Sequence, residues 1–163
     1  MVRPWYWPKN GMPERAEPFN WIIQDKMAIS WWPDPYVIER YRKEGIKVIV
    51  NCSEFDNRQR IPKDFNYFHI NIPDYGIPTE DQLKQFFEIT NEYDTNNHPI
   101  VVHCVGGCGR SGIMVLAWAV YNGIIPKGID PFKWISKLRP CCSEKITKKQ
   151  MKFIRKITQN YQK

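Results

Sequence analysis

The stretch from Ile100 to Asn122, IVVHCVGGCGRSGIMVLAWAVYN, most constrains what this chain can fold into. Its first three residues form an apolar run too short for a helix, which predicts a buried strand. Residues 113–121 are apolar on every side, which predicts a helix packed within the core. A glycine-rich turn joins the two. A site at this junction is expected, because ligands in α/β folds sit outside the carboxyl ends of the strands.

The turn itself, residues 104–110, predicts an anion-binding loop, called the cradle loop below. Its glycines permit a tight bend, and the following helix N-terminus adds a partial positive charge. Cys104 should have a depressed pKa and be a thiolate near neutral pH, and Arg110 can offer a planar guanidinium to the same anion. The backbone N–H groups expected to point inward belong to Val105, Gly106, Gly107, Cys108 and Gly109. A plain core cysteine beside a glycine turn is the alternative.

The spacing C-x5-R also occurs in residues 52–58, CSEFDNR. That segment has no glycine, and Glu54 and Asp56 would repel a phosphate dianion. Only the second copy has a preceding strand, a following helix and a serine directly after the arginine. The sequence therefore places the anion site at Cys104 and not at Cys52.

HCVGGCGRSG resembles the signature of the protein tyrosine and dual-specificity phosphatases, H-C-x5-R-[ST]. The likeness extends to PFNWII, AISWWPDP, IPDYGIPT and the Leu-Arg-Pro at 138–140, in the order seen in small atypical dual-specificity phosphatases and archaeal protein tyrosine phosphatases. About residues 17–158 are covered. The resemblance implies a cysteine-dependent phosphoric monoester hydrolase with a cysteinyl-phosphate intermediate.

Asp74 is the expected general acid. Turns after Asn51, Ile72 and Cys104 should converge on one pocket, and thiolate attack on phosphorus needs a proton donor for the leaving oxygen. The resemblance implies the same role for the Asp of IPDYGIP. The structural alternative places Asp74 at the first position of a Pro-Asp-x-Gly turn.

Four further residues have weaker assignments. The resemblance implies that Ser111 hydrogen-bonds the leaving thiolate. His103 is expected to fix the loop and tune the thiolate, or else to be a buried structural histidine. Gln150 matches the second glutamine of a Gln-Thr-x-x-Gln motif whose first glutamine is missing, and its place in a helix capping box explains it equally well. Three scattered histidines predict no metal site, and no cofactor is expected.

Cysteine chemistry suggests redox control. Cys52 sits at a position from which some members of the superfamily supply a resolving cysteine, so a Cys52–Cys104 bridge is favoured over Cys108–Cys104, whose formation would bend the loop. Both could instead be small buried hydrophobes. An odd number of cysteines, five, without framework spacing indicates a reducing compartment, and adjacent Cys141 and Cys142 are not expected to bond each other.

Alternating strands and helices predict a single α/β phosphatase domain over 1–163, with a largely parallel sheet covered by helices on both faces. Residues 1–18 form a Pro/Trp-rich arm, and 19–163 form the catalytic core. Strands are expected within 19–29, 46–51, 61–72 and 100–102. Helices are expected to end at Gly45, to begin at capping boxes Thr79–Gln82 and Thr147–Gln150, and to run from Asp130 to Leu138.

Composition indicates where the chain is found. The longest apolar run is far below the roughly 18 residues of a membrane span, and the N-terminus has no apolar signal core, so a cytoplasmic protein is expected. A monomer is expected as well. The net charge of +7 is interpreted as a solvated face on the last helix or as steering of acidic substrates.

The expected partner is a phosphorylated protein or peptide carrying phosphotyrosine, with phosphoserine and phosphothreonine left open. Membrane and nucleic acid are not expected partners. Three alternative functions remain open. The resemblance suggests that an RNA 5′-triphosphatase would need no acid such as Asp74, and that a phosphoinositide phosphatase would carry lysines in the loop. A pseudophosphatase would have lost the cysteine, the arginine or the acid.

Overall fold

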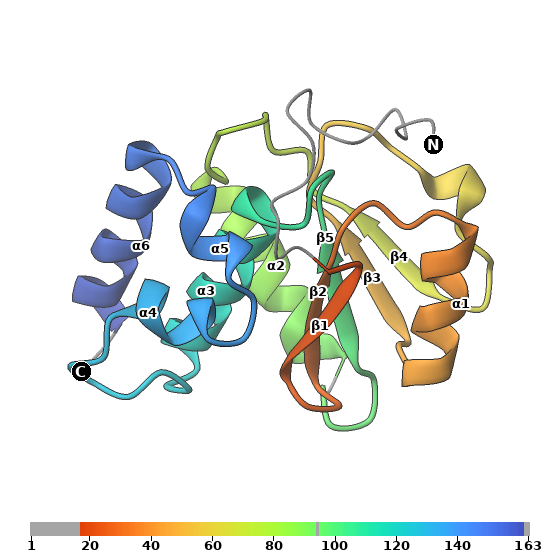
Figure 1. Ribbon diagram of the computed structural model, residues 1–163, viewed down its shortest axis with the longest axis horizontal. Helices are drawn as coiled ribbons and strands as arrows, with labels where there is room; N and C mark the ends of the chain where they lie inside the picture. The colour runs from red at the N-terminus through yellow and green to blue at the C-terminus, as the bar shows by residue number, and fades with distance from the viewer. Residues whose placement is uncertain (1–16, 94, 162–163) are drawn as a thin grey trace.

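The computed structural model describes residues 17–93 and 95–161. Its centre is a five-stranded sheet in the order β1-β2-β5-β3-β4 (Figure 1). The strands are β1 (Phe19–Ile23), β2 (Met27–Ser30), β3 (Val48–Asn51), β4 (Asn66–His69) and β5 (Ile100–His103). β1 and β2 form an antiparallel hairpin, and the other neighbours are parallel. The predicted largely parallel sheet is confirmed.

Helices cover both faces of this sheet, as predicted. Helix α1 (Pro35–Glu44) lies on one face, and Figure 1 shows the remaining helices on the other. These are α2 (Glu80–Glu92), α3 (Gly109–Tyr121), α4 (Pro131–Ser136), α5 (Cys141–Glu144) and α6 (Lys148–Tyr161). A short 3-10 turn, η1 (Arg58–Arg60), stands between β3 and β4.

Two apolar clusters follow from alternation along the strands. In β3, Val48 and Val50 face the cluster that contains α3, whereas Ile49 faces the cluster under α1. Helix α3 is buried from Arg110 to Val120, which fits its continuous apolar sequence. It therefore packs as a central helix, and its N-terminus is fixed at the end of β5.

The helix boundaries have identifiable causes. Asp34 accepts a hydrogen bond from Val37 N at 2.9 Å, and Gly45 ends α1 at φ +85°. The predicted capping boxes at Thr79 and Thr147 both form. The helix expected to reach Leu138 ends at Ser136 instead, because Pro140 has no N–H to donate to the Ser136 carbonyl and the last such bond is Arg139 N to Ile135 O.

The predicted arm, residues 1–18, lies almost wholly outside the described residues. Within the described part of the chain, no helix is long and apolar enough to cross a membrane.

Candidate active site

Cys104 lies at the base of the cradle loop, directly after β5, and is 3% exposed. Gly107 N donates to Cys104 Sγ at 3.2 Å, and Ser111 Oγ lies 3.3 Å from the same sulfur. Gly107 adopts φ +72°, and a Cβ there would come within 2.5 Å of the Ser30 carbonyl oxygen. Only glycine fits, and its conformation turns a backbone N–H toward the sulfur.

Burial alone would raise the pKa of the Cys104 thiol. The positive charge of Arg110, the Ser111 hydroxyl and the backbone N–H groups of Ser111 and Cys108 outweigh burial and lower that pKa below its ordinary value. The thiolate is the nucleophilic form of cysteine. The site therefore favours a reactive sulfur, as the sequence predicts.

Arg110 joins three loops that follow three different elements. Its NH1 group donates to Glu54 Oε1 and to the Ile72 carbonyl, both at 3.0 Å. Its NH2 group lies 3.5 Å from Asp74 Oδ1. The predicted convergence of the turns after Asn51, Ile72 and Cys104 is thus realised around one buried guanidinium, which is 4% exposed.

Glu54 belongs to this cluster, although its sequence position suggests only a charge that would repel phosphate. Burial would raise its pKa, but the hydrogen bond and charge of Arg110 lower it, so Glu54 is a carboxylate beside the guanidinium. Glu54 Oε2 also accepts Asp74 N at 3.1 Å. The sequence feature that indicates this role is the position of Glu54, an acidic residue shortly after the carboxyl end of the buried strand β3.

Buried Asn51 shapes the loop that carries Glu54. Its Oδ1 accepts Ser53 N at 2.9 Å, and its Nδ2 donates to the Phe55 carbonyl at 2.7 Å. These bonds bracket Glu54 on both sides and fix its direction toward the site.

Asp74 lies in an exposed turn, and its side chain is 58% exposed. Gly76 N donates to the Pro73 carbonyl at 2.8 Å, so Pro73, not Asp74, is the first turn residue. Tyr75, at the third position, adopts φ +62°, the left-handed conformation that a type II turn requires. The expected first position for Asp74 is therefore wrong: Asp74 is the second residue of the turn, and its carboxylate lies beside Arg110.

His103 is fully buried. Its Nδ1 lies 3.0 Å from the Cys104 carbonyl oxygen, and its Nε2 lies 3.5 Å from Asn57 Nδ2. Burial lowers the pKa of His103 to about 4, so the ring is neutral near pH 7. A neutral ring that donates from Nδ1 and accepts at Nε2 satisfies both contacts. His103 therefore supports the backbone at Cys104 through its contact with the Cys104 carbonyl.

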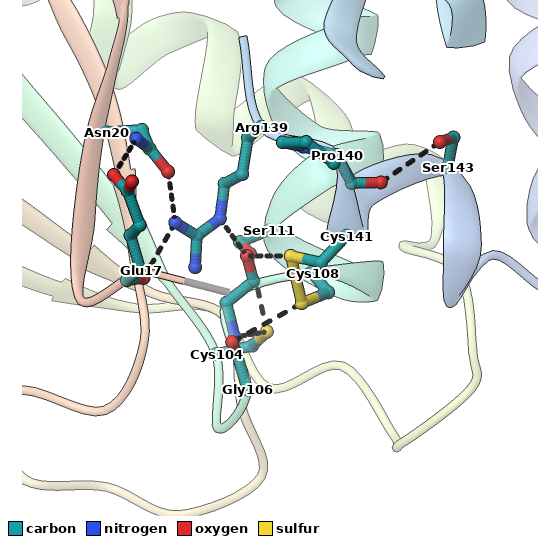
Figure 2. Close-up of a disulfide and its surroundings, with 11 residues drawn as sticks. Glu17, Asn20, Cys104, Gly106, Cys108, Ser111, Arg139, Pro140, Cys141 and Ser143 are labelled. Atoms are coloured by element: carbon teal, nitrogen blue, oxygen red, sulfur yellow. Dashed lines mark hydrogen bonds between the residues drawn. A yellow bond between two sulfur atoms is a disulfide. The ribbon is translucent and has the colours of Figure 1, made fainter. Parts of the chain in front are cut away.

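Arg139 is a second buried arginine. In the sequence it stands out only as part of the Leu-Arg-Pro motif at 138–140. It is 1% exposed, and its Nε donates to the Gly107 carbonyl at 2.6 Å. Its NH1 group donates to Asn20 Oδ1 and to the Glu17 carbonyl. Figure 2 shows Arg139 between these N-terminal residues and the loop. It thereby ties the loop to β1.

Gln150 is buried and fully engaged in structural bonds. Its side chain closes the capping box with Thr147 and donates from Nε2 to the Gly76 carbonyl at 3.0 Å. It thus ties the start of α6 to the turn that carries Asp74. The capping interpretation accounts for Gln150, and its second bond gives it a supporting place near the site.

The cysteines are arranged differently from the expectation. Cys108 and Cys141 form a disulfide with a Cα–Cα distance of 5.4 Å, while Cys52, Cys104 and Cys142 are free. Neither predicted bridge to Cys104 is present. Cys52 is buried and donates to the His103 carbonyl, and burial raises its pKa. The sequence did not predict the Cys108–Cys141 pairing, because Cys141 comes from a corner that only the fold brings to the loop.

The remaining histidines serve other contacts: His69 Nε2 lies 2.7 Å from the Ser53 carbonyl oxygen, and His98 packs on Tyr93. Across residues 17–93 and 95–161, no cluster of three or more His, Cys, Asp or Glu side chains is placed to hold a metal ion.

Comparison with known proteins identifies the class. The sequence profile of the family described as "Polymorphic toxin system, DSP-PTPase phosphatase" matches residues 34–124, more than half of the chain. This chain belongs to that family, and with it to the cysteine-dependent protein tyrosine and dual-specificity phosphatases, a class of phosphoric monoester hydrolases.

Individual relatives agree with this class. Human tyrosine-protein phosphatase non-receptor type 12 is 30% identical over 167 residues, covering 97% of this chain and 19% of that protein. An uncharacterized protein of Methanocaldococcus jannaschii is 27% identical over 63% of this chain, which spans 64% of the relative's length. The crystal structure of Tk-PTP in the active form shares the fold, with a TM-score of 0.69 and 22% identity over 87% of this chain and 97% of Tk-PTP.

Proposed function

We propose that this chain is a protein phosphatase that hydrolyses phosphotyrosine through a cysteinyl-phosphate intermediate, with phosphoserine and phosphothreonine as further candidate substrates. The observation that carries the proposal is the Cys104 sulfur with its lowered pKa. It lies beneath inward-facing loop amides and beside the arginine that faces Asp74. Neither a structural cysteine nor a simple anion site requires this combination.

In the first step, the Cys104 thiolate attacks the phosphorus of a phosphomonoester. An S–P bond forms and the P–O bond to the leaving group breaks, while Asp74 gives its proton to the departing oxygen. The loop amides of residues 105–110 and the Arg110 guanidinium bind the phosphoryl oxygens. Glu54 and the Ile72 carbonyl hold NH1 and so fix the direction of the guanidinium, and its Nε and NH2 groups are proposed to bind the phosphate, NH2 from its place 3.5 Å from Asp74 Oδ1.

In the second step, the Asp74 carboxylate takes a proton from water as the water oxygen attacks phosphorus. The S–P bond breaks and orthophosphate leaves. Ser111, 3.3 Å from the sulfur, donates to the returning thiolate and makes it a better leaving group. The roles of the supporting residues follow from their contacts: Glu54 orients Arg110, Arg139 fixes Gly107, and His103 supports the Cys104 backbone.

Residues 19–163 are proposed as the catalytic core and 1–18 as an arm. We also propose action as a monomer in the cytoplasm. Six exposed basic residues on and before α6 are suited to steering an acidic substrate: Lys145, Lys148, Lys149, Lys152, Arg155 and Lys156.

The deciding experiment compares kcat/KM, without added metal, on a phosphotyrosine peptide and the matched phosphothreonine peptide. Triphosphate-ended RNA and a phosphoinositide dispersed in detergent serve as the competing substrates. Highest activity on the phosphotyrosine peptide, lost in Cys104→Ser, supports the proposal. A clear preference for the RNA or the lipid would reject a protein substrate and leave the chemistry at Cys104 standing.

A further inference from the structure

The disulfide between Cys108 and Cys141 lies within the site and has no part in the chemistry proposed above. Cys108 precedes the first residue of α3, and Cys141 is the first residue of α5. The bridge therefore fastens the middle of the cradle loop to a segment 33 residues further along the chain.

The cradle loop needs external support to keep its shape. Gly106, Gly107 and Gly109 surround Cys108, and glycine loses more conformational freedom on ordering than any other residue. Within residues 104–110, Gly107 N donates to Cys104 Sγ, whereas the Val105 carbonyl is held from outside the loop by Trp32 N. An inward-facing row of amides is therefore costly to maintain without attachments outside the loop.

Two attachments meet at adjacent positions. Arg139 holds the Gly107 carbonyl from outside, and because a trans peptide points its C=O and N–H in opposite directions, the Cys108 N–H faces inward. The same N–H is among the groups that stabilise the Cys104 thiolate. One residue on, the Cys108 side chain is bonded to Cys141.

Both attachments come from one short segment. Arg139 and Cys141 are separated only by Pro140, and Cys141 Sγ lies 3.7 Å from the oxygen that Arg139 holds (Figure 2). The covalent bond thus keeps the Arg139 segment against the loop as well as fixing Cys108.

We propose that the Cys108–Cys141 disulfide is a positioning element of the phosphate cradle, and that the affinity of the site for phosphate depends on whether this bridge is formed. The inference rests on the proposed function and adds to it a redox control separate from oxidation of the nucleophile. The bridged chain is the tight-binding form. The reduced chain has a loosened loop and binds phosphate more weakly.

The chemistry balances with ordinary thiol reagents. Bridge formation removes two electrons and two protons from the thiols of Cys108 and Cys141, and glutathione disulfide takes them to become two glutathione molecules. In the reverse direction, a dithiol thiolate attacks the sulfur of Cys108, which lies in the loop and is 5% exposed; the Cys108–Cys141 bond breaks and Cys141 leaves as a thiolate. The second thiol of the reagent then attacks the mixed disulfide at the reagent's own sulfur, which releases Cys108 and closes the reagent's disulfide.

Binding is best measured in a Cys104→Ser background, where the nucleophile cannot be oxidised or take part in exchange. The chain is prepared with glutathione disulfide, and peptide mapping by mass spectrometry identifies the bridged pair. Calorimetric titration with inorganic phosphate follows, before and after dithiothreitol. We expect about a ten-fold weaker affinity after reduction, the size of losing one well-placed hydrogen bond, and recovery on reoxidation.

Variants separate this effect from a general structural one. Adding Cys141→Ser or Cys108→Ser should give weak binding in both conditions, and the two together should be no worse, because they break the same bond. Cys142→Ser is the matched control: Cys142 is next to Cys141, equally buried and free. It should respond to dithiothreitol as its parent does.

Equal phosphate affinity in the bridged and reduced forms overturns the inference, as does a peptide map in which Cys108 pairs with another cysteine. A parallel assay with nitrophenyl phosphate on the chain with Cys104 intact distinguishes the two proposals. No turnover in either redox state removes the proposed function. Turnover with the same KM in both states removes only the role of the disulfide.

Discussion

Glu54 Oε1 and Arg110 NH1 lie 3.0 Å apart, which joins the two C-x5-R segments of the chain in one site. In the proposed site, the first segment supplies the carboxylate that orients the arginine of the second. Since Arg110 is 4% exposed, its buried charge needs such a partner.

Glu54→Gln tests this orienting role. The amide keeps the size of the side chain but removes the charge, so kcat/KM on nitrophenyl phosphate should fall by roughly ten- to a hundred-fold. Asp56→Asn is the matched control. Asp56 lies two residues away, is half exposed and contacts Tyr67 and Arg58, so its variant should stay within about two-fold. Equal losses in both variants would instead point to disruption of the whole loop.

Local patterns in the sequence were sufficient for much of this fold. The apolar run at residues 100–102, the glycine turn and the fully apolar helix identified β5, the cradle loop and α3, because each element buries its own side chains. The capping boxes at Thr79 and Thr147 were equally visible, since capping depends on residues three positions apart.

The missing parts depend on contacts between distant segments. In the sequence, Glu54 is only a negative charge that would repel phosphate. Its place beside buried Arg110 depends on the pairing of β3 with β5, which brings the two segments together. The Cys108–Cys141 pair depends on where the α4–α5 corner meets the loop. No spacing rule predicts such a pairing, because connectivity cannot be deduced from cysteine positions alone.

Replacement of the nucleophile should separate binding from turnover. Cys104→Ser should abolish hydrolysis of nitrophenyl phosphate and leave binding of inorganic phosphate within a few-fold, because the hydroxyl fits the same space without ionising. Cys52→Ser should remain nearly fully active, since the Cys52 thiol donates to the His103 carbonyl and has no part in the proposed chemistry. If Cys52→Ser were the inactive variant, the assignment of the nucleophile would be wrong.

Asp74→Asn should reveal the proton donor through the leaving group. The wild-type kcat/KM should show a bell-shaped pH profile, rising as Cys104 ionises and falling as the acid deprotonates, and the variant should lose the falling limb. The loss of rate should be larger for an alkyl phosphate than for nitrophenyl phosphate, whose leaving oxygen scarcely needs a proton. Equal damage to both substrates would remove Asp74 from the acid role.

Ser111→Ala should raise the pKa of Cys104, because the hydroxyl 3.3 Å from the sulfur is among the groups that lower it. The thiolate exists above that pKa, so the rate of alkylation of Cys104 by iodoacetamide should reach half its plateau at a higher pH in the variant. Ser143→Ala is the control, because Ser143 is exposed in α5 and bonds only the Pro140 carbonyl. An unchanged midpoint in Ser111→Ala would contradict the proposed contact.

His103 should make the fold sensitive to acid. Burial lowers its pKa from 6.5 to about 4, so the unfolded chain binds a proton more readily than the folded one. The contribution of the neutral ring is complete above pH 6.5 and is lost as the pH falls from 6.5 toward 4. At pH 4.5 the wild type should have lost roughly 2 to 3 kcal/mol of unfolding free energy through this residue.

Urea unfolding at pH 7 and pH 4.5 measures that loss. A comparison between variants cancels the pH-dependent contribution of the carboxylates to the unfolding free energy, because that contribution is common to all of them. His103→Asn should be less stable than wild type at pH 7, because the ring and its contact with the Cys104 carbonyl are removed, yet should lose less stability on acidification. His98→Asn, at an exposed position beside Tyr93, should show the same pH dependence as wild type. If His103→Asn and wild type lost equal stability between the two pH values, His103 would have to be protonated in the folded chain, and its place as a neutral support under Cys104 would be untenable.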